Sequence, residues 1–354
     1  MYRRIKGKFL FYKHYLFQAI KIRVKTRGSK SDFWARMYYA FFDSSFVREN
    51  RAVLQGKIVH QEGFITGTLN EYKIRRNIHR LEKGLIMPIR RDVFAKDYIM
   101  ETVKAFVQEQ QKKEYNVQMI EWAKDVLNSY FMTVKHEGTI NESFELFRKY
   151  SDTEKTPVLI PHERLIPNDK TMDYDGFLEL CIQRVSTRIF QPKSVHRELL
   201  DKAFNAALRS PSACNRQPFE FLVYDKEEDI KKLIKLPGGI SGFDKDVPVL
   251  IFLIGDLSAY FDERDRHLIY IDGGLVSMSL MLALETLGLA SCALNWPDIE
   301  EKERALGDAL KLPQYKRCIL AMTVGYPDVE GGIPYSLKKS MENTVKYNHE
   351  YPHR

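Results

Sequence analysis

Two arginines lie four positions apart in the run RVSTRIF, and the hydroxyl of Ser186 falls between Arg184 and Arg188. Forked guanidinium donors together with a hydroxyl suit the oxygens of a phosphate group. The same spacing also fits an ordinary solvent-exposed helix end. Taken alone, the segment therefore indicates an anion site without identifying the anion.

A second polar segment, PSACNRQPF, leads from a helix-like stretch of small residues directly into a strand-like run. It begins at Pro211 and carries the hydroxyl of Ser212 and the amides of Asn215 and Gln217. Amides fixed at a helix-to-strand turn can present donors and acceptors to a planar heteroaromatic ring. The simpler interpretation is a turn bounded by prolines.

A third basic element, Lys338-Lys339, follows the strand-like run that ends in TVGYP. These lysines are either surface residues or the last cations of an anion site. The chain has no GxGxxG after its first strand-like run and no GxxxxGK[ST], so a Rossmann or P-loop nucleotide site is not supported. Its 4 cysteines are far apart and form no CxxC, which argues against a zinc site or disulfide framework and fits a reducing cytoplasm.

The elements that must position these residues alternate between helix and strand after residue 173. Hydrophobic periodicity predicts helices over 174–184, 195–209, 226–235, 267–288 and 299–310. Apolar β-rich runs predict strands over 219–224, 248–255, 290–295 and 317–324. Interleaved helices and strands predict an α+β fold, with a mixed sheet flanked by helices.

The first half of the chain is predicted to be mainly helical, with clear helical patterns over 97–113 and 117–134. Proline, glycine and polar residues then accumulate over 136–172, which marks a boundary. We expect a basic aromatic arm, a helical extension, a linker and a second domain. Their respective ranges are 1–46, 47–150, 151–172 and 173–350.

The formal net charge of +8 is concentrated at one end of the chain. Residues 1–40 carry a net charge of +10, so the rest of the chain carries −2. Basic and aromatic residues alternate in the arm, as they do in interfacial helices and in nucleic-acid grooves. Peripheral membrane contact through 1–46 and packing on the rest of the chain or a partner stay open, whereas nucleic-acid binding is disfavoured.

Several segments, in this order, resemble the nitroreductase family of FMN-dependent oxidoreductases. The family's PSxxNxQPW-type turn is matched from Pro211 to Pro218, with Phe219 in place of the usual tryptophan. Arg184, Ser186 and Arg188 resemble its RxSxR element. The VGYP-type strand end, the closing basic segment and the helix from 272 to 291 are matched as well. The resemblance covers roughly 175–348.

The resemblance implies a homodimer with FMN in the interface. Arg184, Ser186 and Arg188 would hold the phosphate and ribityl chain, and Lys338 or Lys339 would add charge. The residues that would border the isoalloxazine ring are Pro211, Ser212, Asn215 and Gln217. A backbone N–H near Asn295-Trp296 would donate to flavin N5. The family often has a glycine pair there, so the bulkier residues put the shape of the pocket in doubt.

The resemblance also implies the chemistry: NAD(P)H reduces the flavin and leaves, and an electron-poor small molecule is then reduced in the same position. Because no acid–base side chain is required, no catalytic side chain is assigned. Two alternatives remain. One is a flavin-fold enzyme of a biosynthetic pathway, with surface polysaccharides suggested by a resemblance of the HRLEKGL segment. The other is a non-catalytic recruitment module at the membrane surface, with the protein otherwise cytoplasmic.

Overall fold

The computed structural model describes residues 22–68, 70–152, 156–164 and 172–349. The first half of the predicted arm and parts of the predicted linker therefore lie outside the described residues. The C-terminal half contains a four-stranded sheet in the order β1-β2-β4-β3, with every neighbouring pair antiparallel. Its strands are β1 (Phe219–Tyr224), β2 (Val249–Asp256), β3 (Ala290–Leu294) and β4 (Lys316–Gly325). An isolated parallel bridge between Ser186 and Ser291 adds a short segment beyond β3.

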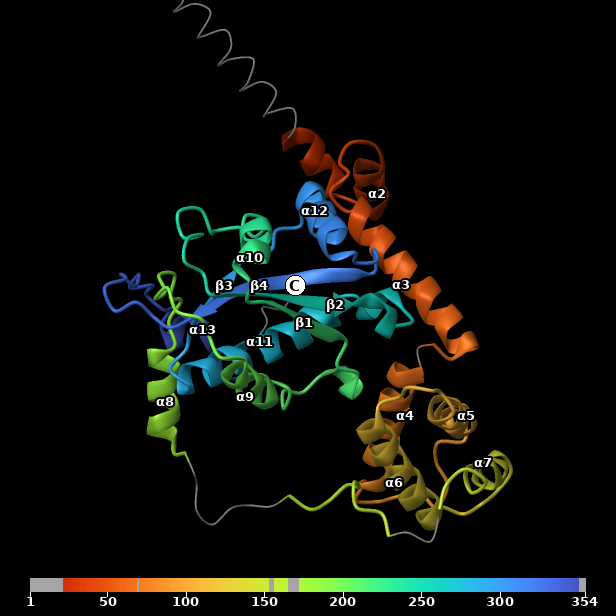
Figure 1. Cartoon of the computed structure of the whole chain (residues 1–354). Helices are drawn as coiled ribbons and strands as arrows, with labels where there is room; N and C mark the ends of the chain where they lie inside the picture. Colours follow the sequence, from red (N-terminus) through yellow and green to blue (C-terminus); the bar gives the residue numbers. More distant parts are fainter. Residues whose placement is uncertain (1–21, 69, 153–155, 165–171, 350–354) are drawn as a thin grey trace, which may run out of the picture.

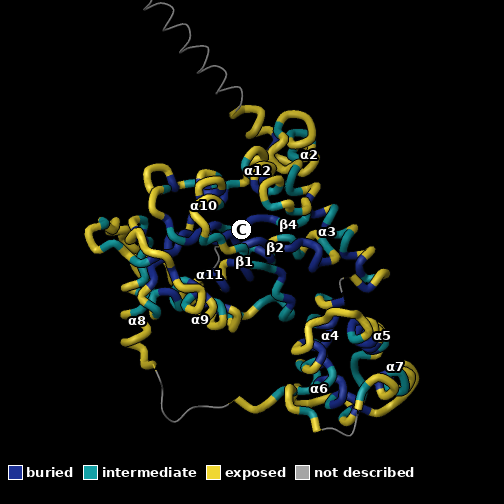
Figure 2. Tube along the Cα trace, viewed as in Figure 1, coloured by how far each residue is buried: buried dark blue, intermediate teal, exposed yellow. Residues whose placement is uncertain are grey.

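Helices cover both faces of this sheet (Figure 1). The helices packed against one face are α10 (Glu227–Leu233) and α12 (Glu300–Leu310). The helices against the other face are α9 (Arg197–Ala207) and α11 (Leu268–Thr286). Because β2 lies between two strands and under helices on both sides, all its residues are buried, which explains its unbroken apolar sequence (Figure 2). The predicted α+β fold is confirmed.

The helical extension has an apolar core of its own, separate from the cores of the sheet. This core is formed by α4 (Asn70–Leu85), α5 (Ile99–Gln110), α6 (Val117–Thr133) and α7 (Thr139–Phe147). Tyr130, Phe106 and Phe147 are its largest fully buried side chains. The described residues 156–164 carry no helix or strand. The domain limits drawn from the sequence stay a prediction.

A long helix, α3 (Val47–Thr66), joins the extension to the sheet-containing half. Its Ala52 and Val53 pack with residues that follow β2, including Leu257. Gly56 permits the approach, because a Cβ atom there would lie 2.9 Å from the Cβ of Leu257. Arg48 also pairs with the buried Glu303 of α12. Both apolar packing and an ion pair therefore connect α3 to the sheet-containing half.

Candidate functional site

The arginine segment follows α8 (Tyr174–Gln183) and is fixed to the outer edge of β3. The backbone N–H of Thr187 donates to the carbonyl of Ser291 at 3.1 Å. Arg188 donates from Nη1 to the carbonyl of Ser186 at 3.3 Å. Arg184 itself is the C-cap of α8, with its N–H donating to the carbonyl of Leu180, so the alternative of a helix end describes Arg184, whereas Ser186 to Arg188 lie along the edge of β3.

The guanidinium of Arg184 has unused donor capacity. Its Nε is buried and has no hydrogen-bond partner. Across the described part of the chain, no carboxylate lies within 4.0 Å of Arg184 or Arg188. Burial raises the pKa of Glu285, and the nearby charge of Arg184 opposes that rise. A buried, unpaired N–H is costly unless a ligand satisfies it, so the segment fits a phosphate group.

The second segment forms a strained turn around a short 3-10 helix, η1 (Ala213–Asn215). Three of its non-glycine residues have positive φ: Cys214 at 53°, Asn215 at 52° and Gln217 at 52°. Such conformations cost free energy and persist only where surrounding contacts impose them. Strain of this kind clusters at functional sites, which favours a binding turn over an ordinary one.

Hydrogen bonds hold this turn in place. Both carboxylate oxygens of Asp272, near the start of α11, accept from the N–H of Ala213 at 3.0 and 3.1 Å. The hydroxyl of Ser212 accepts from the N–H of Gln217 at 3.1 Å, and the Gln217 amide donates to Asn215 Oδ1 at 2.8 Å. The sequence prediction missed Asp272 as a positioning residue, although an acid in an otherwise apolar helix was an available signal.

One protomer does not bring the arginine segment and the turn together. Asp272 holds the turn near the first turn of α11, whereas Arg184 lies near Glu285 in the last. At 1.5 Å per residue, these two positions on the helix are about 20 Å apart. The arginine segment and the strained turn therefore form two groups of site residues at opposite ends of α11.

Asn295 and Trp296 follow β3, and each contacts a different part of the domain. The carbonyl of Asn295 accepts from the N–H of Gly238 at 2.7 Å. The indole of Trp296 is buried beside Phe252, and its Nε1 donates to Glu303 Oε1 at 2.5 Å. The Trp296 indole is therefore occupied, whereas the exposed Asn295 and the backbone of Trp296 are left to meet a ligand.

Lys338 and Lys339 lie on an exposed coil before α13 (Met341–Thr344). Among the described residues, neither lysine has an acid within 4.0 Å. The chain leaving β4 begins beside the arginine segment, since the N–H of Gln191 donates to the carbonyl of Tyr326 at 2.9 Å. Gly325 permits this contact, because a Cβ there would lie 2.9 Å from the Phe190 ring. Within the described residues, neither lysine contacts Arg184.

The sequence of this half matches a known family. The model of the nitroreductase family matches residues 182–240 and 236–326, which contain the arginine segment, the strained turn, the whole sheet and α11. This part of the chain is a nitroreductase-family domain. The nitroreductase domain makes the protein an oxidoreductase, of a family whose members are flavoproteins.

Relatives of the nitroreductase domain come from archaea, bacteria and animals. A Methanothermobacter thermautotrophicus protein provisionally named NADH dehydrogenase/NAD(P)H nitroreductase is 28% identical over 42% of this chain and 76% of its own. Iodotyrosine deiodinase 1 of Rattus norvegicus is 21% identical over 53% of this chain and 75% of its own. An FMN-dependent nitroreductase from Clostridium difficile superposes with a TM-score of 0.42 and 24% identity, over 49% of this chain and 99% of its own.

Proposed function

We propose that this protein is an FMN-dependent oxidoreductase that takes electrons from NAD(P)H and passes them to an electron-poor small molecule in a two-step reaction. The observation that carries the proposal is the arginine segment, which is fixed to the β3 edge and offers the buried, unpartnered Nε of Arg184. When bound, FMN would supply the redox chemistry, accepting electrons in one step and releasing them in the next.

The chain's own residues would bind and orient the flavin. Arg184, Ser186 and Arg188 would hold the phosphate and the ribityl chain, and Lys338 or Lys339 would add positive charge. The residues proposed to border the ring are Pro211, Ser212, Asn215 and Gln217. The backbone N–H beside Asn295 and Trp296 would donate to flavin N5, because the Trp296 indole is already occupied by Glu303.

We also propose that the active form is a homodimer. The two groups of site residues lie at opposite ends of α11. If a two-fold axis paired the α11 helices of two protomers in antiparallel orientation, the turn of one protomer would lie beside the arginine segment of its partner. The solvent-facing side of α11 is suitably apolar, with Ile271, Leu275 and Met278 exposed. These side chains, with those of α8, offer an apolar surface that a partner would bury.

The same apolarity gives α11 a second interpretation. Within the described residues, Glu263–Thr286 is long and apolar enough to cross a membrane by length and composition, and 39% of its most apolar window is buried inside the protein. The buried side packs on the sheet and the exposed side is the proposed dimer surface. We therefore attribute its apolarity to packing on two sides within a dimer.

The full-length protein, purified without added cofactor, is expected to be yellow, with the absorption spectrum of an oxidised flavin and FMN as the species released on denaturation. Anaerobic NADH or NADPH should bleach that absorption, and an electron-poor acceptor such as a quinone should restore it. A colourless protein that also fails to bind added FMN would contradict the proposal. Bound FMN that neither nicotinamide reduces would contradict the proposed electron donor.

A specific observation favours peripheral membrane contact as a second property. Helix α2 (Asp32–Phe41) has no buried residue, and its Trp34 and Phe41 are 58% and 72% exposed. Residues 22–28 before it are helical and carry Arg23, Lys25 and Arg27. Exposed aromatic side chains beside cations suit the interface of an anionic lipid bilayer. We therefore propose that this part of the arm binds such a surface.

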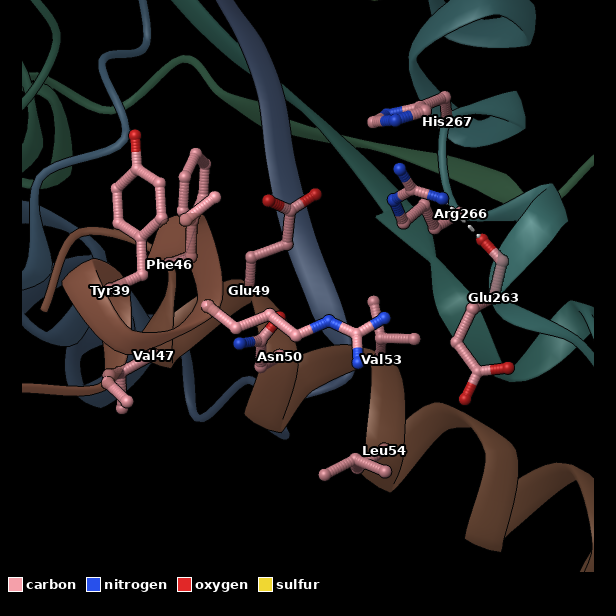
Figure 3. A pocket seen from close by; sticks show the side chains of 13 residues that line it. Tyr39, Phe46, Val47, Glu49, Asn50, Val53, Leu54, Glu263, Arg266 and His267 are labelled. Carbon is pink, nitrogen blue, oxygen red and sulfur yellow. Dashed lines mark hydrogen bonds between the residues drawn. The ribbon is translucent and has the colours of Figure 1, made fainter. Parts of the chain in front are cut away.

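An apolar groove of about 990 Å³ lies between α2 and α3 (Figure 3). Tyr39, Phe46 and Val53 line it, and Arg266 and His267 border it from the start of α11. The Tyr39 ring of α2 packs edge-on against Phe46, the N-cap of α3, with 4.6 Å between ring centres. Trp34 and Phe41 of α2 stay exposed and are available for a lipid surface.

Vesicle co-sedimentation tests the membrane proposal. The full-length protein should bind vesicles that contain phosphatidylglycerol and should not bind phosphatidylcholine vesicles. The double variant Trp34→Ser, Phe41→Ser should bind at least about tenfold more weakly, because each buried aromatic side chain contributes roughly 1.5–3 kcal/mol. Met132→Ser, at an exposed position of the extension, is the matched control. Equal binding by the double variant and the wild type would contradict the proposal.

A further inference from the structure

Helix α4 of the extension lies against the strained turn of the nitroreductase domain. It brings the guanidinium of Arg76 to 5.6 Å from the centre of the Phe261 ring and close to Cys214 of η1. Arg216, which follows η1, is buried with its guanidinium 5.1 Å from the centre of the Tyr260 ring. Two arginines from distant parts of the sequence therefore meet beside the turn.

These arginines are not neutralised by acids. In the described ranges, no carboxylate lies within 4.0 Å of Arg76, Arg80 or Arg216. The charges of Glu101 and Asp272 act on Arg76 and Arg216 from beyond contact distance, because Glu101 accepts from the Asn77 amide at 2.8 Å and Asp272 accepts from Ala213. Unpaired, partly desolvated cations are costly, and an anion would offset that cost.

The neighbouring residue shows the contrast. Arg75 pairs with Glu71 one turn earlier, at 3.0 Å between Nε and Oε1. For Arg76, burial lowers the pKa, and the like charges of Arg216 and Arg80 lower it further. Of these two adjacent arginines on α4, Arg75 has a carboxylate partner, whereas Arg76 lies near two other cations.

A shallow, open pocket of about 540 Å³ lies beside Arg76. Its lining residues are His60, Gln61, Phe64, Ile65, Arg76 and Phe261. His60 is only 4% exposed; its Nδ1 donates to the carbonyl of Ser258 at 2.6 Å, and its buried Nε2 has no partner. Since burial also lowers the pKa of this imidazole, Nε2 is an unused hydrogen-bond acceptor.

We propose that this pocket binds a small organic anion. Its carboxylate or phosphate would pair with Arg76 and offset the repulsion that Arg216 exerts on Arg76, and its apolar part would lie against Phe64 and Phe261. A hydroxyl on the ligand would donate to Nε2 of His60. The site goes beyond the proposed oxidoreductase function, and none of its lining residues is among those proposed to hold the flavin.

Isothermal titration calorimetry on the full-length protein tests the site with benzoate as probe, alongside inorganic phosphate and the neutral analogue benzyl alcohol. Benzoate should bind once per protomer and more tightly than benzyl alcohol. Arg76→Met should weaken benzoate binding about tenfold to hundredfold, the value of a charge-assisted hydrogen bond. Arg76→Lys, which keeps the charge, should stay within a few-fold of wild type. Phosphate binding without benzoate binding would overturn the proposed organic ligand.

Arg75→Met is the matched control, because that arginine already has a carboxylate partner, and its benzoate affinity should equal that of the wild type. Without ligand, Arg76→Met should melt at the same temperature as the wild type or higher, since it removes an unpaired cation. Unchanged benzoate affinity in Arg76→Met, no benzoate binding by the wild type, or equal binding of benzyl alcohol would overturn the proposal. Because binding heat needs no flavin, the result is independent of the proposed cofactor.

Discussion

Changing Arg184 and Arg188 together to alanine is expected to give a folded but colourless protein. The two guanidiniums are the unpaired cations at the β3 edge, and each charge-assisted hydrogen bond to a phosphate contributes roughly 1.5–3 kcal/mol. Losing both should weaken FMN binding about a hundredfold or more. The ratio of flavin absorbance to protein absorbance in the purified dimer measures the effect, and titration with added FMN gives the affinity.

Arg197→Ala is the control for that experiment. Arg197 lies on the same domain and is bound bidentately by Asp225 on the surface, at 2.6 and 3.0 Å. Its replacement should leave the flavin content at the wild-type value. If the double variant at 184 and 188 retained stoichiometric FMN, the phosphate would have to lie elsewhere.

Leu275→Asp is expected to remove both the dimer and the flavin. Leu275 is 44% exposed on the free side of α11, and a carboxylate there would have to be buried without a partner when two such helices meet. Because the two groups of site residues lie at opposite ends of α11, a monomer would keep only one group at each flavin. Sedimentation velocity measures the oligomeric state, and absorbance in the same run measures bound flavin.

Met132→Asp separates this effect from general disruption of the surface. Met132 is 72% exposed on α6 of the extension, away from α11, so the variant should stay dimeric and yellow. Two results would contradict the proposed arrangement: a Leu275→Asp variant that remains a dimer, or a monomer that keeps its full flavin content.

The sheet was largely predictable from sequence because its strands are short apolar runs between turn residues. The prediction of 219–224 matches β1, and 290–295 exceeds β3 by one residue. The predicted helix 267–288 likewise became α11, trimmed at both ends. Local periodicity carries this information, since it reflects which faces of each element are buried.

The spatial arrangement of the site was not predictable in the same way. Arg184 and Asn215 were named from their motifs, but nothing in the spacing placed them at opposite ends of one helix. Likewise, Arg76 lies in the extension, far from Arg216 in sequence, and their meeting depends on how α4 packs against η1. Such contacts are tertiary, and the pattern of either segment alone does not encode them.

The close packing of α3 on the residues after β2 has an evolutionary consequence. A Cβ atom at position 56 would lie 2.9–3.0 Å from the Cβ atom and from the backbone C and O atoms of Leu257, so a shorter side chain at 257 would not make room for a larger residue at 56. Homologues that carry the extension should therefore keep glycine at 56, and those without it should be free to vary there and to have a polar residue at 257. The extension and the nitroreductase domain would then be inherited as one unit and would not recombine freely as separate modules.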